Sequence, residues 1–185
     1  MKRFLLSACL GMFLLSCNDS KDKTPAAGGG DSSGTAMDKP VMDLPYTASF
    51  SSSFTTDVSD ADLKMVLQSY KDWADGNLTG LANEMGDTIT VDMSNGAHLV
   101  KSNADLMKMW GTYRDSLSKV DIDMQAWQKM YATNKKEAYV VVWYKETDWY
   151  KSGKADSAYF HDINGVKNGK ITGYEQYRRP AAGPK

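Results

Sequence analysis

Asp92 and His161 are the residues of this 185-residue chain whose types best suit proton transfer. Asp92 lies near the end of a β-branched run, and His161 lies within a later aromatic run. A carboxylate in a pocket lined by Trp and Met is pushed toward a higher pKa by desolvation. Histidine titrates near neutrality and can donate a hydrogen bond to an enolate-like oxygen. Inside a dry cavity, the pair could therefore abstract a proton next to a carbonyl or carry out a dehydration.

Simpler roles exist for these side chains and for the other candidates. A strand histidine can be an ordinary pocket-wall or surface donor, and an aspartate at a strand end can form a turn. Asp162 and Glu175 are expected to face each other across a hairpin. Two such carboxylates can share a proton in a buried cleft, but we favour a solvated surface for them. His98 follows a turn and is expected to be exposed without a partner.

Cysteine and histidine usage and net charge exclude several classes of function. The chain has two Cys and two His, and no Cys lies near either His, so a zinc site of the usual kind is not expected. The formal net charge is −1, and it would be −3 without Lys2 and Arg3. Nucleic-acid binding needs clustered basic residues, so this balance argues against it. The sequence implies no metal and no cofactor.

The N-terminus has the layout of a secretory signal peptide, with Lys2 and Arg3 ahead of an apolar run over residues 4–15. At about 1.5 Å per residue this run spans roughly 18 Å, well short of the ~30 Å needed to cross a bilayer. We therefore favour a removed signal over a transmembrane helix. A removed leader would include Cys9, which leaves neither a disulfide nor a catalytic thiol in the mature protein.

The sequence Leu14-Leu15-Ser16-Cys17 resembles the lipobox of bacterial lipoproteins. The resemblance implies cleavage of residues 1–16 and attachment of acyl chains to Cys17. Two or more acyl chains suffice for stable anchoring. We therefore predict a lipid-anchored protein of the bacterial cell envelope, and the residues that follow Cys17 suit an outer-membrane location.

Composition divides the rest of the chain into a tether and one domain. Residues 17–45 are rich in Gly, Ser, Asp, Lys and Pro, so they are predicted to form a flexible tether behind Cys17. Residues 46–59 alternate aromatic and small polar residues, which is consistent with an edge strand or an extended arm. The domain is expected over residues 60–179, and residues 180–185 form a tail.

Three helices are predicted in the first half of the domain. Ser59 and Asp62 form a capping pair for a helix over residues 60–74, which Gly76 ends. A short helix follows over residues 78–85. Asn103 can cap a third helix, whose apolar residues recur at spacings of three and four.

Strands account for the rest of the domain. A short strand is expected over residues 88–93, and long strands follow from residue 120, over 138–150, 155–163 and 171–178. The run over 138–150 is apolar on both faces and should be central in its sheet. Asn168-Gly169 predicts a two-residue hairpin turn, in which Lys167 faces Lys170. An uninterrupted ladder would then pair Ile163 with Tyr174, His161 with Gln176 and Tyr159 with Arg178. Three helices followed by long antiparallel strands predict an α+β fold.

The order of these elements, with Asp75-Gly76-Asn77-Leu78, Gly86-Asp87 and Asn168-Gly169-Lys170-Ile171, resembles the nuclear-transport-factor-2-like superfamily. The nearest groups are the polyketide-cyclase-like and ketosteroid-isomerase-like ones. The resemblance covers residues 60–179. It implies a cone-shaped, strongly curved antiparallel sheet wrapped around the helices, a pocket at the open end, and homodimers formed through the outer sheet face.

The ketosteroid isomerases suggest roles for the candidate residues. The resemblance is best with the His161 face toward the pocket, where His161 falls on the acid that bonds the oxyanion. Asp92 falls on the carboxylate that moves the proton. The first-helix tyrosine of the isomerases falls on Ser69, one residue before Tyr70, so the catalytic set is not the same. The resemblance and the aromatic stripes together predict these pocket residues: Ser69, Tyr70, Trp73, Trp110, Tyr113, Trp143, Tyr159, Ile163, Tyr174, Gln176 and Arg178.

We therefore predict a membrane-anchored domain that binds a small, largely apolar molecule in the pocket of the cone. An alternative is an isomerase, dehydratase or cyclase that uses Asp92 as base and His161 as oxyanion donor. A third alternative is a protein-interaction module with a filled cone.

Overall fold

The computed structural model describes residues 43–181, so the predicted leader, Cys17 and most of the tether lie outside the described residues. Three helices are present: α1 (Asp60–Asp75), α2 (Leu78–Glu84) and α3 (Asn103–Arg114). The side chain of Ser59 caps α1 by accepting a hydrogen bond from the Asp62 amide at 2.9 Å. Gly76 ends α1 in the left-handed conformation, with φ of 74°. No helix among residues 43–181 is long and apolar enough to cross a membrane.

Seven strands form one curved sheet in the order β1-β4-β5-β6-β7-β2-β3. Their bounds are β1 (Phe54–Thr55), β2 (Met85–Asp92), β3 (His98–Ser102), β4 (Leu117–Ala132), β5 (Glu137–Tyr150), β6 (Ala155–Lys167) and β7 (Lys170–Pro180). An antiparallel sheet was predicted. The observed sheet is mixed, because β2 pairs with β7 in parallel. This pair is possible because the long segment from β3 to β6 separates its strands in the sequence. Within the segment 46–59, β1 is an edge strand on β4.

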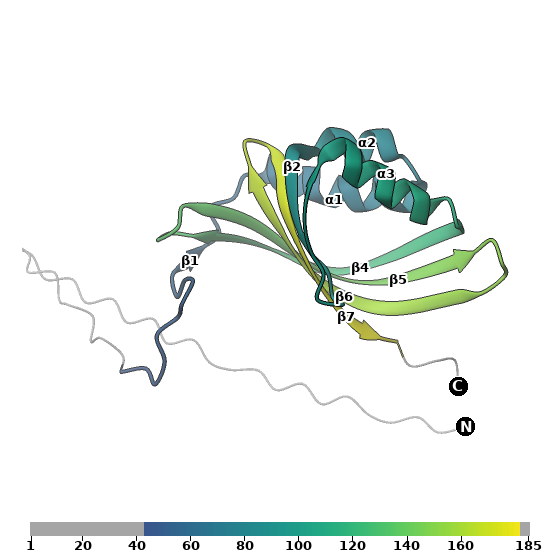
Figure 1. The fold of residues 1–185 in the computed structure, drawn as a ribbon. Helices are drawn as coiled ribbons and strands as arrows, with labels where there is room; N and C mark the ends of the chain where they lie inside the picture. Colours follow the sequence, from purple (N-terminus) through teal and green to yellow (C-terminus); the bar gives the residue numbers. More distant parts are fainter. Residues whose placement is uncertain (1–42, 182–185) are drawn as a thin grey trace, which may run out of the picture. The chain divides into compact units, whose positions relative to one another are not determined.

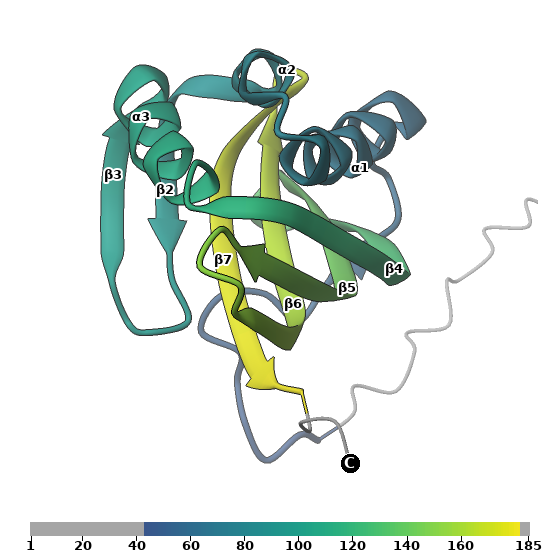
Figure 2. The ribbon, with the colours of Figure 1, turned by 90° about the vertical axis from the view of Figure 1, so that its right-hand side faces the viewer.

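The helices lie on the concave side of the sheet, as the two views of the ribbon show (Figures 1 and 2). One face of α1 is buried through Val66 and Tyr70 against the sheet. The residues that pack between the helices and the sheet with no exposed surface are Val66, Ile89, Val91, Leu106, Val140, Val142 and Ile171. The sheet is curved, and beside this core it leaves a cavity between the helices and strands β5, β6 and β7.

The central position of β5 is confirmed, since it pairs with β4 on one side and β6 on the other. Alternate β5 residues point to the concave side, among them Val140, Val142 and Tyr144, which are all buried. The strand then continues on the same face with Glu146 and Asp148. Two acidic residues therefore follow an apolar series on the inner face of the sheet.

The β6–β7 hairpin has the predicted turn but not the predicted register. Asn168 and Gly169 both have positive φ, at 53° and 69°, and Lys167 faces Lys170 as expected. Thr172 is then an extra residue in β7, because Val166 pairs with Ile171 and Gly165 pairs with Gly173. Beyond this bulge every partner is shifted by one: Asn164 faces Tyr174, Asp162 faces Gln176, His161 faces Tyr177, and Phe160 faces Arg178.

Because of this bulge, the predicted pairing of β6 residues with β7 is wrong beyond Val166. A shift of one residue exchanges the two faces of a strand. Tyr174 and Gln176 therefore share a face with Asn164 and Asp162, whereas His161 lies on the opposite face.

Candidate ligand pocket

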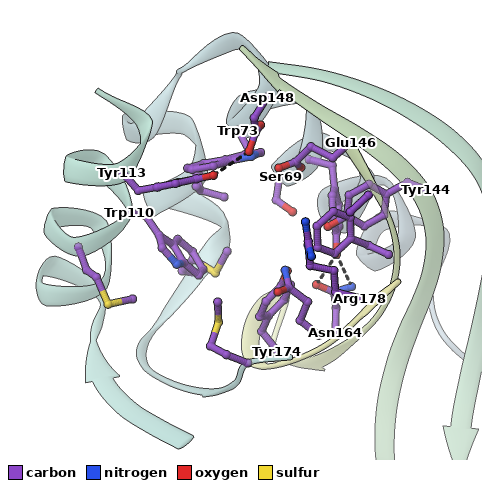
Figure 3. Close-up of a pocket in the computed structure, with 18 of the residues that line it drawn as sticks. Ser69, Trp73, Trp110, Tyr113, Tyr144, Glu146, Asp148, Asn164, Tyr174 and Arg178 are labelled. Atoms are coloured by element: carbon purple, nitrogen blue, oxygen red, sulfur yellow. Dashed lines mark hydrogen bonds between the residues drawn. The ribbon is translucent and has the colours of Figure 1, made fainter. Parts of the chain in front are cut away.

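A cavity of about 400 Å³ lies between the helices and the concave face of the sheet. Figure 3 shows that side chains from the helices and from the strands surround a common space. From the helices, from β2 and from the residue that follows it, the cavity is lined by Ser69, Tyr70, Trp73, Leu81, Met85, Met93, Met109, Trp110 and Tyr113. From β5, β6 and β7 it is lined by Tyr144, Glu146, Asp148, Asp156, Ala158, Phe160, Asn164, Tyr174, Gln176 and Arg178. The interior is therefore not filled.

Aromatic rings form much of the cavity wall. The rings of Trp73 and Tyr113 are parallel within 5°, with centroids 6.2 Å apart. Trp110 meets Tyr174 edge to face at 6.1 Å. Such walls offer flat apolar surface, and the thioethers of the lining methionines can adapt to an irregular ligand.

Asp162 lies beneath the cavity wall with no exposed surface. One of its carboxylate oxygens, Oδ2, accepts hydrogen bonds from three tyrosine hydroxyls: Tyr144 at 2.7 Å, Tyr174 at 2.9 Å and Tyr70 at 3.0 Å. Burial raises the pKa of Asp162 to about 6, and the three hydrogen bonds oppose that rise because they stabilise the charged form. The cluster holds a charged carboxylate at neutral pH.

This arrangement also fixes the direction in which the tyrosine hydroxyls donate their hydrogen bonds. Each donates its proton to Asp162, so its oxygen presents lone pairs to other groups. The amide of Gln176 donates to the Tyr174 oxygen at 2.8 Å, and the amide of Asn164 donates to the Tyr70 oxygen at 3.1 Å. Burial raises the pKa of all three tyrosines well above its usual range, so they stay protonated.

Glu146 and Asp148 form a second acidic group in the cavity wall. The hydroxyl of Tyr113 donates to Asp148 Oδ2 at 2.8 Å. Asp148 is only 8% exposed, and its other oxygen, Oδ1, is buried without a hydrogen-bond partner among the described residues. Burial first, and the charge of Asp148 second, raise the pKa of Glu146 to about 8, while a hydrogen bond from Trp73 opposes the rise. Burial also raises the pKa of Asp148. The pair therefore shares a proton near neutral pH.

Two guanidinium groups lie close to this acidic pair. Arg178 lines the cavity and binds Asp156 at 2.7 Å. Arg114 donates hydrogen bonds to the carbonyl oxygens of Trp73 and Ala74, at 3.1 and 3.0 Å, at the end of α1. Arg178 is thus paired with Asp156, whereas Arg114 stabilises the negative end of the α1 dipole and its charge opposes the rise in the pKa of Asp148.

Most of the predicted pocket residues line the cavity. They are Ser69, Tyr70, Trp73, Trp110, Tyr113, Tyr174, Gln176 and Arg178. Trp143, Tyr159 and Ile163 are absent from the lining, because the bulge and the pairing of β5 with β6 place them on the other face. There the ring of Trp143 stacks on His161 with centroids 4.7 Å apart.

The structure does not bring Asp92 and His161 into the cavity, since neither lines it. His161 lies between Trp143 and Tyr177 on the outer face. The Oδ1 atom of Asp92 lies 2.6 Å from His98 Nδ1, and both side chains are at least half exposed. The expectation that His98 has no partner is therefore wrong. The two histidines occupy sites unrelated to the cavity.

The acidic residues of the cavity were missed or misplaced by the sequence analysis. Asp162 was expected on a solvated surface opposite Glu175, but it is fully buried and faces Gln176. Glu146 and Asp148 were not singled out, although a signal exists. They follow Val142 and Tyr144 at every second position of the same strand. Because side chains alternate between the two faces of a strand, they lie on the same inner face.

Comparisons with known proteins identify the fold. No family model matches this sequence, and no curated protein matches it. Solved structures do match: an LEH-like epoxide hydrolase from M. tuberculosis has a TM-score of 0.55 at 8% identity, over 64% of this chain and 83% of that one. An NTF2-like protein from Anabaena variabilis has a TM-score of 0.52 at 17% identity, over 69% and 96%. A putative SnoaL-like polyketide cyclase from Jannaschia sp. has a TM-score of 0.53 at 10% identity, over 66% and 90%.

At these identities the likeness establishes the fold alone. The described domain has the α+β cone fold of nuclear-transport-factor-2-like proteins, in agreement with the predicted fold class.

Among residues 43–181, no three His, Cys, Asp or Glu side chains are grouped so that they could hold a metal ion.

Proposed function

We propose that this domain binds a small, largely apolar molecule inside the cone. The observation that carries the proposal is the cavity itself: about 400 Å³, walled by aromatic and methionine side chains, with a few polar groups at defined positions. Ligand sites of proteins are typically cavities of about 300–1,000 Å³ with this kind of lining. The cavity has room for a molecule of two or three fused rings.

Two tryptophan variants test the proposal. Trp110 lines the cavity, whereas Trp127 on β4 is 52% exposed and does not line it. We expect a panel of neutral apolar ring compounds to include ligands that quench tryptophan fluorescence and raise the melting temperature. Trp110→Ala should weaken their binding about tenfold or more, because one wall is removed, while Trp127→Ala should leave it unchanged. The proposal fails if the whole panel is without effect on the wild-type protein.

A second candidate function, an isomerase, dehydratase or cyclase, is favoured by one observation. Glu146 and Asp148 lie two residues apart on the same face of β5, and both line the cavity. Burial raises the pKa of both carboxyls, that of Glu146 to about 8, which suits a general acid–base pair. These carboxyls, and not Asp92 and His161, would carry the proton. Turnover of a bound compound, followed by NMR, should then be lost in Glu146→Gln and kept in Asp92→Asn. Binding without turnover in the wild-type protein argues for a binding protein.

The lipobox-like sequence supports a location for this activity. We propose that acyl chains on Cys17 anchor the protein in the outer membrane, with the domain held on a flexible tether. A Cys17→Ala variant is expected to leave the membrane fraction, and unchanged partitioning into detergent would contradict the anchor. Self-association through the outer sheet face stays a prediction, which the molecular mass in solution would test.

A further inference from the structure

The acidic residues of β5 indicate which class of small molecule the cavity takes. Resting on the proposed function above, we propose that the ligand is a flat apolar molecule bearing an ammonium group, which binds against the carboxylates of Glu146 and Asp148 and the rings of Trp73 and Tyr113.

In the described part of the chain, the acidic pair has only one hydroxyl donor and no cationic partner in contact with it. Asp148 Oδ1 is buried and lacks a hydrogen-bond partner among the described residues, although Tyr113 satisfies the other oxygen. Glu146 lies two residues earlier on the same face of β5 and also lines the cavity. Within residues 43–181, neither carboxylate has a Lys, Arg or His partner within 4 Å. In the free protein the proton shared by Glu146 and Asp148 supplies the donor between the two carboxyls. Glu146 keeps some exposure to the cavity, and an ammonium group bound there would take the place of that proton.

Negative charge exceeds positive charge around the pair. Asp156 is near Asp148, and the buried Asp162 adds a further negative charge on the same side of the sheet. Of the two nearby cations, Arg178 is paired with Asp156, and Arg114 is bound to carbonyl oxygens at the end of α1, where its charge partly opposes the rise in the pKa of Asp148. Two guanidinium groups thus face four carboxyl groups. The cavity is therefore short of positive charge, which a cationic ligand would supply.

The groups around the pair also suit an organic cation. The parallel rings of Trp73 and Tyr113 offer aromatic faces beside the carboxylates, and such faces attract organic cations. Figure 3 shows both rings and Asp148 at the same side of the cavity. On the opposite wall three tyrosine hydroxyls donate to Asp162, and the amides of Asn164 and Gln176 donate to two of those tyrosines, so these donors are already engaged. A ligand rich in donors fits this site better than an anion or a ketone.

The proton shared by the pair is consistent with the same conclusion. Burial and Asp148 raise the pKa of Glu146 to about 8, so the free site holds a proton near pH 7. An ammonium group that binds there would stabilise both carboxylates in their charged form. The shared proton would then leave, and binding would release close to one proton.

Two probes with the same ring system test the inference: 2-naphthylmethylamine, which carries the ammonium, and 2-naphthylmethanol, which does not. Calorimetric titrations use the full-length protein in detergent, with protein-free titrations subtracted. We expect the amine to bind at least about tenfold more tightly than the alcohol at neutral pH. Buffers of different ionisation enthalpy should reveal proton release with the amine and none with the alcohol.

The double variant Glu146→Gln/Asp148→Asn should lose most of this preference while it keeps its affinity for the alcohol, which also shows that it is folded. Asp123→Asn is the matched control, because it removes an exposed carboxylate of β4 outside the cavity and should keep the preference. Equal affinities in the wild-type protein, or a preference that survives the double variant, overturn the inference but not the proposed function. If neither probe binds, the inference falls, and the proposed function falls with it only if the neutral panel also has no effect.

Discussion

Asp162 and the Glu146–Asp148 pair are two buried acidic sites on the same face of the sheet, yet they hold their protons differently. Asp162 has no exposed surface, and its pKa is about 6. Glu146 retains some exposure, and its pKa is about 8. Burial alone would give the opposite order, because the more deeply buried carboxyl loses more solvation.

The difference lies in the neighbours of each site. Three hydroxyls donate to Asp162 and stabilise its charge. Glu146 has the negative charge of Asp148 beside it and only the indole of Trp73 as an opposing donor. At the first site three hydroxyls converge on Oδ2 of Asp162, although its Oδ1 is buried without a partner among the described residues, and the cluster supports the wall. The second site has a single hydroxyl donor within residues 43–181, from Tyr113, and is left incomplete at the cavity surface. An incomplete site that faces a cavity is a place where a ligand can bind.

Removal of the Asp162 carboxylate should have the largest effect. Asp162→Ala leaves three tyrosine hydroxyls without their acceptor, two of them on Tyr70 and Tyr144, which are almost fully buried. We expect a loss of about 3–5 kcal/mol in the free energy of unfolding, measured by urea denaturation. The exposed-site control Asp123→Ala should change it by less than about 0.5 kcal/mol. A loss as small as the control's would show that the cluster contributes little.

The charge of Glu146 should have the next largest effect, and it should depend on pH. Its pKa rises from 4.5 to about 8 on folding, so the native state holds a proton that the unfolded state has lost. The stability that this carboxyl contributes is therefore complete below pH 4.5 and is lost as the pH rises to about 8. Glu146→Gln removes this dependence and should be more stable than the wild type above pH 8, by roughly 2–4 kcal/mol. Stability curves that run parallel from acid to alkaline pH would contradict the assignment.

The smallest expected changes in the free energy of unfolding come from two tyrosine variants, one at each acidic site. Tyr144→Phe removes a buried donor to Asp162 and should cost about 1.5–3 kcal/mol, because the bond is to a charged group. It should also raise the pKa of Asp162, which NMR titration of its carboxyl carbon can follow. Tyr113→Phe removes the donor to Asp148, but Tyr113 is 42% exposed, so water can replace it. We expect a cost of about 1 kcal/mol or less, and equal losses would erase the distinction.

The elements of the fold were predictable because their signals are local. The cap at Ser59, the left-handed Gly76 and the Asn168-Gly169 turn all appear in the structure at the predicted positions. The parallel pairing of β2 with β7 was not predictable, because it joins strands about eighty residues apart and leaves no pattern in either strand. The strand β3, with few buried residues, also gave no signal.

The candidate site was predictable on its helical side and on β7, where Trp73, Trp110 and Tyr174 line the cavity. It was not predictable on β6. The single extra residue at Thr172 exchanges the faces of that strand relative to β7, which moves His161 out and Asp162 in.

The sequence alone determined the boundaries of most helices and strands, the hairpin turn, and the aromatic residues available for a pocket, since each depends on neighbours within a few positions. The tertiary structure decided which carboxylates are buried and what surrounds them. A carboxylate's protonation depends on the groups that fold against it, and Asp162 meets its three tyrosines from α1, β5 and β7 only when the sheet curves around the helix.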